Sequence, residues 1–439
     1  MRERVVITGV GCITPLGTEV DQVWQRLVDG RSAIGRLTLF DASNFDVQIA
    51  AEVRAWDMSD VGEDPRHWQH APRQTHFAVA SAIKAYASAG LSSASIDPLR
   101  VGVYLGCGET YQDFFQFADL VDGALEGDRF HQERFSRNAL RVWQPDVESA
   151  LELNMPACHL AGMFNAQGPN ANCIAACASS SQAIGEAAEI IRRGDADVML
   201  AGGAHSMIHP FGLTGFQRLS ALSTRNDCPA SAVRPFDRDR DGFVLGEGGA
   251  IVVLENLDHA RRRGAEIWGE LTGFGAAQDA YRVTDAHPEG RGAASSIQRA
   301  LDDARLNPED IDYINAHGTG TVVNDKVETA AIKRVFGRHA YRVPISSSKS
   351  MMGHLTTAGG AVELVIAMLT VRNGVLPPTI NYETPDPECD LDYVPNTARE
   401  VPCRHVLSNS LGFGGQNAAL VVSRYDGPPT AHPARAPAA

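Results

Sequence analysis

The chain has 439 residues, of which 44% are apolar and 21% are charged, an ordinary composition for a folded protein with a large core. The formal net charge of −14 argues against broad nucleic-acid binding, which requires a basic surface. No window approaches the ~18–20 consecutive apolar residues that span a bilayer, and the N-terminus carries no secretory signal, so we expect a cytoplasmic protein without a membrane segment.

Short β-branched or apolar runs alternate with longer segments of helical periodicity along the chain. In residues 184–191 and 362–369, apolar side chains recur on one helical face. This alternation favours an α/β protein with a largely parallel sheet. The predicted strands are residues 5–8, 101–105, 198–201, 250–254, 312–315, 343–346, 406–408 and 418–422.

The chain divides into two halves that echo one another. Cys177 in the first half and His354 in the second each precede a segment rich in small residues. We expect one half over residues 1–256 and the other over 257–424, with a Pro/Ala-rich disordered tail over 425–439. A polar, charged and aromatic stretch within residues 108–153 predicts a surface insertion in the first half.

The first candidate site residue is Cys177, in the segment Asn-Cys-Ile-Ala-Ala-Cys-Ala-Ser-Ser-Ser of residues 172–181. We expect Cys177 in the first turn of a helix, where unpaired N–H groups and the helix dipole stabilise a thiolate. The eight cysteines form no CxxC pair, so neither a disulfide framework nor a zinc site is expected. A buried structural cysteine is the alternative, and this segment alone favours it. Cys173, four residues before Cys177, could be an example of such a cysteine.

A candidate histidine follows the predicted strand at 312–315. Two glycines keep the backbone open beside His317, and the hydroxyls of Thr319 and Thr321 can bond a polar ligand. A neutral imidazole in this position can donate a hydrogen bond to a developing oxyanion. A lone histidine after a strand can equally be structural, and this segment alone leaves both interpretations open.

A second histidine, His354, lies five residues after Lys349 and nine before Glu363. Glu363 belongs to an apolar helical segment, where a carboxylate without a partner would be costly. We therefore expect Lys349 and Glu363 to form a buried pair that orients the site. The ordinary alternative for Lys349 is a solvated surface side chain.

Near the end of the chain, Phe413 is surrounded by three glycines at positions 412, 414 and 415. The N–H groups of such a loop can point at a ligand. A tight turn between two strands is the alternative, and the segment by itself favours it.

Two further segments resemble motifs whose chemistry they cannot perform. Residues 237–248 begin like a calcium loop, but Gly248 stands where a bidentate glutamate is required. Residues 9–14 resemble a dinucleotide-binding fingerprint after a strand, but the third glycine is missing. We therefore expect neither a metal nor a nicotinamide cofactor.

Taken together, the cysteine, the two histidines, the Lys–Glu pair and the glycine-rich loop resemble the site of the β-ketoacyl-acyl carrier protein synthases of the elongating, Cys-His-His type. The resemblance runs from residue 5 to about residue 422 and includes the segments 194–199, 221–227, 234–237, 241–248 and 376–381. It implies an α/β, thiolase-like fold of two pseudo-symmetric halves in αβαβα layers.

The resemblance implies a decarboxylative Claisen condensation. Cys177 would take an acyl chain from a carrier phosphopantetheine thioester, with the N–H groups of Cys177 and Phe413 as the oxyanion hole. His317 and His354 would assist decarboxylation of malonyl-acyl carrier protein and stabilise the enolate. Attack of this carbanion on the acyl-cysteine gives a 3-oxoacyl-acyl carrier protein two carbons longer.

Further roles are implied by position in the family. Lys349 and Glu363 would orient the histidines, Thr319 and Thr321 would hold the pantetheine arm, and Phe413 would gate the acyl pocket.

Such enzymes act on substrates held by an acyl carrier protein and assemble as homodimers or, in some polyketide systems, as heterodimers with a chain-length-factor relative. Because carrier proteins are acidic, docking requires basic residues. Arg66, Arg73 and Arg218 are candidates for that surface, and ordinary solvated arginines are the alternative.

Two departures from the family pattern are Ala176 and Gln416, where the family often has threonine. Residues 108–153 are longer than in the housekeeping fatty-acid enzyme, which favours a polyketide or polyene ketosynthase over the alternative of primary fatty-acid elongation.

A thiolase would have a second cysteine where this chain has His354. A non-catalytic chain-length-factor subunit typically lacks the nucleophile, which here is present as Cys177.

Overall fold

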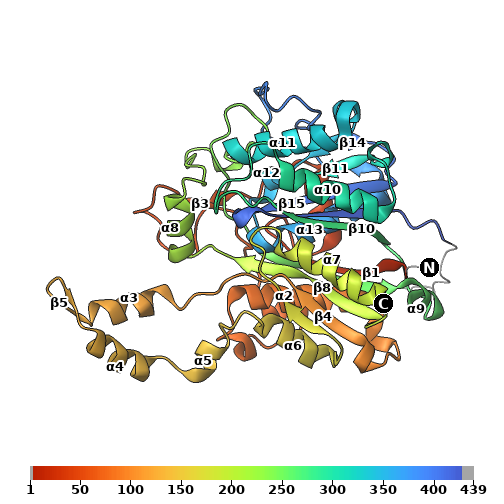
Figure 1. The fold of residues 1–439 in the computed structure, drawn as a ribbon. Coiled ribbons are helices and arrows are strands. Elements are labelled where there is room, and N and C mark those ends of the chain that lie inside the picture. Colours follow the sequence, from red (N-terminus) through yellow and green to blue (C-terminus); the bar gives the residue numbers. More distant parts are fainter. Residues whose placement is uncertain (1–2, 428–439) are drawn as a thin grey trace.

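The computed structural model describes residues 3–427 and is built around a ten-stranded sheet (Figure 1). Across the sheet the strand order is β12-β11-β15-β16-β10-β1-β9-β8-β4-β7. The bounds in chain order are β1 Val5–Ile13, β4 Val101–Leu105, β7 Asn170–Asn172, β8 Val198–Ser206, β9 Glu247–Asn256, β10 Gly269–Gln278, β11 Tyr313–Asn315, β12 Ile345–Ser346, β15 His405–Gly412 and β16 Gln416–Ser423.

The sheet is mixed, so the prediction of a largely parallel sheet is wrong. The central ladders β8–β9, β9–β1, β1–β10, β10–β16 and β16–β15 are antiparallel. Parallel pairing is confined to the two ends, where β4 lies between β7 and β8, and β11 lies between β12 and β15.

The two halves of the sheet repeat one topology. The order β7-β4-β8-β9-β1 in the first half corresponds strand for strand to β12-β11-β15-β16-β10 in the second. A short helix, α9 (Leu257–Arg262), connects β9 to β10, and we propose residues 257–264 as the junction between the halves. The two halves join where β1 pairs with β10 over only two residues on each strand.

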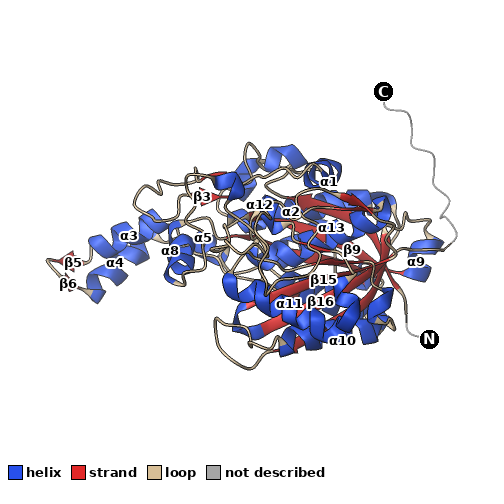
Figure 2. Ribbon diagram, turned by 90° about the horizontal axis from the view of Figure 1, so that it is seen from above, coloured by secondary structure: helices blue, strands red, loops and turns tan. Residues whose placement is uncertain are grey.

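Helices form three layers around the two half-sheets (Figure 2). Helix α2 (Arg73–Ser88) packs against β1, β9 and β8, and α10 (Arg291–Ala304) packs against β10 and β16. Between the half-sheets lie α7 (Ser179–Arg192) and α13 (Gly359–Asn373), which contact one another. Every residue of α13 from Gly359 to Val371 is buried, as expected of a helix enclosed by layers on both sides.

The remaining elements connect these layers. Small two-stranded ladders pair β2 with β3, β5 with β6, and β13 with β14. Their bounds, with those of the other helices, are α1 Val20–Val28, β2 Gly35–Arg36, β3 Ile49–Ala50, α3 Phe114–Asp122, β5 Leu125–Glu126, β6 Arg129–Phe130, α4 Gln132–Val142, α5 Pro145–Ser149, α6 Met155–Phe164, α8 Pro210–Arg218, α11 Val322–Phe336, α12 Lys349–Met352, β13 Val375–Leu376 and β14 Arg399–Glu400.

The segment predicted as an insertion forms an arm, which we define as residues 113–149 with α3, β5, β6, α4 and α5. Figures 1 and 2 show that the arm extends away from the body of the molecule. Aromatic rings hold it together, with Phe135 packing against Phe117 and Trp143. The arm nevertheless leaves Phe115 61% and Leu140 85% exposed.

The glycines of the apparent dinucleotide fingerprint serve helix packing. A Cβ at Gly9 would lie 2.3 Å from the carbonyl oxygen of Ala85, and one at Gly11 would lie 2.1 Å from that of Ser81. Both carbonyls belong to α2, so the two glycines let this helix lie directly on β1.

Among residues 3–427, no helix combines the length and apolar character needed to cross a membrane. The predicted disordered tail lies, from residue 428 onward, outside the described residues.

Candidate active site

Cys177 lies in a turn between β7 and α7 rather than in a helix. The prediction that it occupies a first helical turn is wrong, because α7 begins at Ser179. Ala176, the preceding residue, has φ +46°, a left-handed conformation that alanine rarely adopts. The hydroxyl of Ser179 holds this turn by accepting the Ala175 N–H at 2.8 Å and donating to the Ala176 carbonyl at 2.6 Å. The thiol of Cys177 is therefore presented by a strained turn that the hydrogen bonds of Ser179 hold in place.

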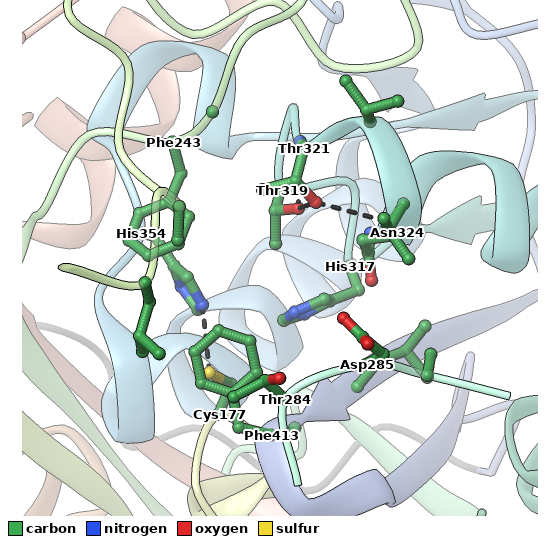
Figure 3. Close-up of a pocket in the computed structure, with 18 of the residues that line it drawn as sticks. Cys177, Phe243, Thr284, Asp285, His317, Thr319, Thr321, Asn324, His354 and Phe413 are labelled. Carbon is green, nitrogen blue, oxygen red and sulfur yellow. Dashed lines mark hydrogen bonds between the residues drawn. The ribbon is translucent and has the colours of Figure 1, made fainter. Parts of the chain in front are cut away.

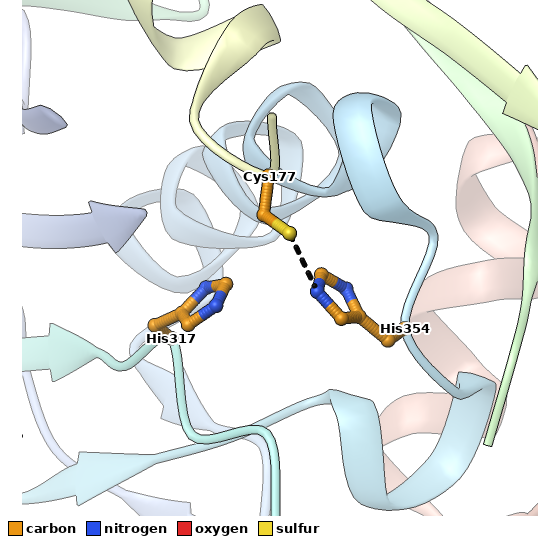
Figure 4. A group of neighbouring side chains, drawn as sticks. All are labelled: Cys177, His317 and His354. Carbon is orange, nitrogen blue, oxygen red and sulfur yellow. Dashed lines mark hydrogen bonds between the residues drawn. The ribbon is translucent and has the colours of Figure 1, made fainter. Parts of the chain in front are cut away.

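His354 faces this thiol directly. Its Nε2 lies 3.1 Å from Sγ of Cys177 (Figure 4). Its Nδ1 accepts the backbone N–H of Thr356 at 3.2 Å, so in the neutral ring the proton is on Nε2. His354 therefore points an N–H donor, and not a basic nitrogen, at the sulfur.

His317 follows β11 and presents the same kind of donor. Its Nδ1 lies 3.4 Å from Nζ of Lys349. Because an ammonium only donates, Nδ1 is the acceptor and Nε2 carries the proton. The two imidazole rings are 5.3 Å apart and nearly perpendicular. Both rings thus direct Nε2–H groups into the space beside Cys177.

A residue that the sequence analysis missed fixes the His317 loop. The carboxylate of Glu328, on α11, accepts the N–H groups of His317 and Gly318, both at 2.8 Å. Glu328 is fully buried, and burial raises the pKa of its carboxyl. The sequence offered no clear signal for Glu328, because charged and polar residues surround it in α11, unlike Glu363 in the apolar α13.

Lys349 and Glu363 form a buried ion pair, so the predicted contact exists in the structure. Each residue is 2% exposed, and Nζ of Lys349 donates directly to Glu363. Burial raises the pKa of Glu363 to about 7, against the opposing effect of Lys349. The pair connects α12 and α13 and places a positive charge against His317.

Burial, together with the Lys349 ammonium, keeps both histidines neutral. Burial, followed by the nearby Lys349 ammonium, lowers the pKa of His317 and of His354 well below the usual value. Both rings are therefore uncharged at neutral pH. Neutral imidazoles with fixed Nε2–H groups are suited to hydrogen-bond an oxygen that gains negative charge.

The resting thiol should ionise only at high pH. Burial raises the pKa of Cys177 to about 11, although Lys349 and the N–H groups of Phe413 and Cys177 lower it. Because the thiolate is the reactive form, the rate of Cys177 alkylation by iodoacetamide should rise about tenfold per pH unit from pH 7 to 10. Mass spectrometry of the Cys177 peptide measures this rate, and a plateau below pH 8 would contradict the raised pKa.

Cys177, His317 and His354 all line a cavity of about 260 Å³ (Figure 3). Thr319 and Thr321 line it as well, with their hydroxyls 2.9 Å apart. The cavity therefore contains the thiol, both imidazoles and two further hydroxyl groups. Leu219, Val322 and Val323 also line the cavity, and each is nearly half exposed, so it opens to solvent between α8 and α11. Thr284 and Asp285 are among the other lining residues and were not predicted.

Phe413 lies in the turn between β15 and β16, and it lines the same cavity. The segment is therefore the tight turn that the sequence by itself favours, and it also lines the cavity. That its N–H groups point at a ligand stays a prediction. Gly414 and Gly415 have φ of +78° and +77°, which favour glycine. The Phe413 ring lies 6.4 Å from that of Phe216 on α8.

The site also contains a set of potential metal ligands. Sγ of Cys177 and one ring nitrogen each of His317 and His354 lie within 4.8 Å of one another. A thiolate and two imidazoles are ligands that Zn²⁺ accepts. The Lys349 ammonium beside His317 opposes a cation, and Nε2 of His354 already bonds Sγ. A metal would bind here only by displacing that hydrogen bond.

Comparison with known proteins identifies the family. The family described as beta-ketoacyl synthase, N-terminal domain, matches residues 2–260, and its C-terminal domain matches residues 268–383. The chain is 43% identical to 3-oxoacyl-[acyl-carrier-protein] synthase 2 of Coxiella burnetii over 423 residues, covering 96% of this chain and 99% of the relative. It is also 43% identical to a putative polyketide beta-ketoacyl synthase 1 of Streptomyces halstedii over 425 residues, with 96% and 98% covered.

Among solved structures, the ishigamide ketosynthase/chain length factor superposes with a TM-score of 0.86 at 33% identity, covering 97% of this chain and all of the matched one. The fold of two repeated half-sheets in five layers and the family resemblance predicted from the motifs are therefore confirmed. This chain belongs to the β-ketoacyl synthase family, and it is a condensing acyltransferase with the thiolase-like fold.

Proposed function

We propose that this enzyme joins an acyl group held on Cys177 to a two-carbon unit from malonyl-acyl carrier protein. In the first half-reaction, the Cys177 thiolate attacks the acyl thioester and releases the carrier thiol. In the second, malonyl-acyl carrier protein loses CO₂, and the resulting carbanion attacks the acyl carbonyl and expels the thiolate. The observation that carries the proposal is the convergence of one thiol and two neutral imidazole donors in one cavity.

The proposed roles follow from the hydrogen bonds. Loss of CO₂ places negative charge on the malonyl thioester oxygen, which the Nε2–H groups of His317 and His354 would bind. The backbone N–H groups of Cys177 and Phe413, which lower the pKa of the thiol, would bind the oxyanion that forms at the acyl carbon. Lys349, paired with Glu363, is assigned to orienting His317.

The acyl chain requires a space of its own, because the acyl carrier and the malonyl carrier each insert their phosphopantetheine through the same opening. We assign the phosphopantetheine of the carrier to the cavity that Thr319 and Thr321 line. To the acyl chain we assign a second cavity of about 330 Å³, which lies between α8 and the start of residues 113–149. Support for the second assignment is Glu109, which lines it and whose carboxylate adds to the effect of burial in raising the pKa of Cys177.

The walls of this second cavity favour specialised metabolism. They combine the aromatic rings of Tyr111 and Phe114 with polar residues, including Glu109 and His209. An aromatic and polar wall suits a conjugated or oxygen-bearing chain better than a long saturated one. We therefore propose type II polyketide or polyene synthesis. Primary fatty-acid elongation is the second candidate, because the chain is equally similar to a 3-oxoacyl-[acyl-carrier-protein] synthase 2.

The proposed assembly is a dimer, either of two copies or with a chain-length-factor relative. Support comes from the exposed apolar side chains of the arm and from the similarity to a ketosynthase/chain length factor. The reaction itself, with its malonyl-acyl carrier protein substrate, is assigned to the cytoplasm. All eight cysteines are free thiols, as a reducing compartment would keep them. No resident cofactor is part of the proposal.

Of the three arginines considered for carrier docking, only Arg218 suits the task well. Arg73 donates to the buried carboxylate of Glu247 through both Nε and Nη2, each at 2.7 Å, and is therefore not free to bind a carrier. Arg66 is exposed but paired with Asp64. Arg218 is exposed at the end of α8, next to Leu219 on the rim of the cavity.

Replacing Arg218 should weaken the use of carrier-bound substrates. Arg218→Glu puts a negative charge where an acidic carrier would approach, and we expect the KM for malonyl-acyl carrier protein to rise about tenfold. The KM for a malonyl thioester of N-acetylcysteamine, which has no carrier, should not change. Steady-state kinetics with both substrates checks this. Arg261→Glu is the matched control, because α9 lies at the opposite end of the molecule from α8 (Figures 1 and 2).

The proposed function is tested by intact-mass analysis after incubation with carrier proteins that bear different acyl chains. A mass increase on the protein, followed by product on addition of malonyl-acyl carrier protein, supports it and names the preferred chain. Acylation only after co-expression with a homologous partner would identify an obligate heterodimer. No acylation in either case would overturn the proposal.

A further inference from the structure

The turn directly after His354 has an unfavourable backbone conformation. Thr356 has φ +50°, in the left-handed region that β-branched residues adopt very rarely. Such a conformation persists only where surrounding contacts hold it. Thr356 is 3% exposed and opens the 3₁₀ turn Thr356–Ala358 that leads into α13.

This turn controls the tautomer of His354. The Thr356 N–H donates to Nδ1 of His354 at 3.2 Å and so keeps the ring proton on Nε2, which faces Cys177. The φ of Thr356 sets the orientation of the Leu355–Thr356 peptide group, which contains this N–H, relative to the 3₁₀ turn and α13 that follow. If Thr356 relaxed to a negative φ, the N–H would lose its alignment with Nδ1.

The side chain of Thr356 is held by a second histidine, His205, at the end of β8. Nε2 of His205 lies 3.2 Å from the carbonyl oxygen of Glu109. Because a carbonyl only accepts, Nε2 carries the proton, and Nδ1 is the acceptor for the Thr356 hydroxyl. The two hydrogen bonds therefore use both nitrogens of one neutral imidazole.

His205 is itself fixed in place and does not line the cavity that contains Cys177. It is 1% exposed, and a Cβ at Gly108 would lie 2.5 Å from its Nε2, so backbone packs closely against the ring. The Glu109 carboxylate is 3.8 Å from Nε2, and its side chain is 56% exposed. His205 thus connects the segment that enters the arm to the turn behind His354.

We propose that His205 is a positioning residue that holds Thr356 in its left-handed conformation and thereby fixes the Nε2–H tautomer of His354. The inference rests on the proposed function and deepens it. His205 would orient His354, whose Nε2–H is a proposed donor to the malonyl thioester oxygen. His205 acts only through Thr356, and it touches neither the thiol nor the substrate cavity.

The first test compares variants by their rate of malonyl-acyl carrier protein decarboxylation. His205→Ala and Thr356→Val both remove the side-chain hydrogen bond. Each should lower kcat by roughly 10- to 100-fold, less than the 10²–10³-fold of a lost donor, with KM unchanged. Thr357→Val is the matched control, because it removes a neighbouring buried hydroxyl that has no hydrogen-bond partner among the described residues. Unchanged kcat in both test variants would overturn the proposal.

The second test is rescue by glycine. Glycine adopts a positive φ without strain, so Thr356→Gly should keep the N–H in place without help from His205. In a Thr356→Gly background, His205→Ala should therefore cost no more than about threefold, a clear departure from additivity. An equal loss in both backgrounds would show that His205 acts by another route.

The third test needs no substrate. In protein labelled with ¹⁵N-histidine, the His354 signals, assigned with His354→Asn, should show a neutral ring protonated at Nε2. In His205→Ala, and likewise in Thr356→Val, they should show a mixture of tautomers, and Thr356→Gly should restore the single form. Unchanged shifts would overturn the positioning role. A wild-type enzyme that fails to condense substrates would instead count against the proposed function alone.

Discussion

The Cys177→Ala protein is expected to gain no mass from acyl carrier protein thioesters and to lose condensation by on the order of 10⁴-fold or more, as enzymes do when a covalent nucleophile is removed. Cys177 carries the only thiol among the residues that line the cavity. Intact-mass analysis measures acyl transfer, and product formation from malonyl-acyl carrier protein measures condensation.

The same variant should still decarboxylate malonyl-acyl carrier protein. We assign that step to the Nε2–H donors of His317 and His354. Neither depends on the sulfur for its orientation, since their Nδ1 atoms are held by Lys349 and by the Thr356 N–H. Cys158→Ala, which removes an exposed cysteine, is the control and should behave as wild type. Acylation of the Cys177→Ala protein at any other residue would contradict the assignment of the nucleophile.

The strands that the sequence predicted are those whose side chains are apolar. All eight predicted segments coincide with strands of the central sheet, and only β7 and β10 were missed. In β10 the buried positions alternate regularly, but glycine occupies three of the four, at 269, 273 and 275. A Cβ at Gly273 would lie 2.2 Å from the carbonyl oxygen of Ala300 on α10. Close helix packing had replaced the apolar pattern on which the prediction relied.

Strand direction was not available from the same pattern. Alternating strands and helices favour parallel pairing, which does occur between β4 and β8 and between β11 and β15. The last two strands, β15 and β16, follow one another through a single turn at Phe413 and are therefore antiparallel. In the first half, β8 and β9 are likewise antiparallel neighbours. Forty residues separate them in the sequence, so their pairing could not be predicted from a short turn.

At the site, residue types could be predicted from the sequence, whereas the conformations that position them could not. A buried carboxylate needs a partner, and that argument correctly paired Lys349 with Glu363. The left-handed turns at Ala176 and Thr356 have no sequence signal, because neither residue favours a positive φ. Since those turns place the thiol and fix the tautomer of His354, the chemistry of the site depends on backbone conformations that only the structure reveals.

His317→Ala and His354→Ala should each slow malonyl decarboxylation by about 10²–10³-fold, the typical cost of removing one donor to a developing oxyanion. Their effects on acyl transfer should differ. His354 bonds Sγ of Cys177 at 3.1 Å, whereas His317 is held by Lys349 and makes no hydrogen bond to the sulfur among the described residues. We therefore expect His317→Ala to acylate at nearly the wild-type rate and His354→Ala to acylate more slowly.

Rapid-quench measurement of acyl-enzyme formation, together with release of ¹⁴CO₂ from labelled malonyl-acyl carrier protein, separates these two half-reactions. His70→Ala, which removes an exposed histidine, is the control and should match wild type in both. Equal losses of acylation and decarboxylation in both variants would mean that the histidines act as one unit on the thiol. The neutral, Nε2-protonated rings argue against that outcome, because a ring with its free nitrogen already bonded cannot take the proton of Cys177.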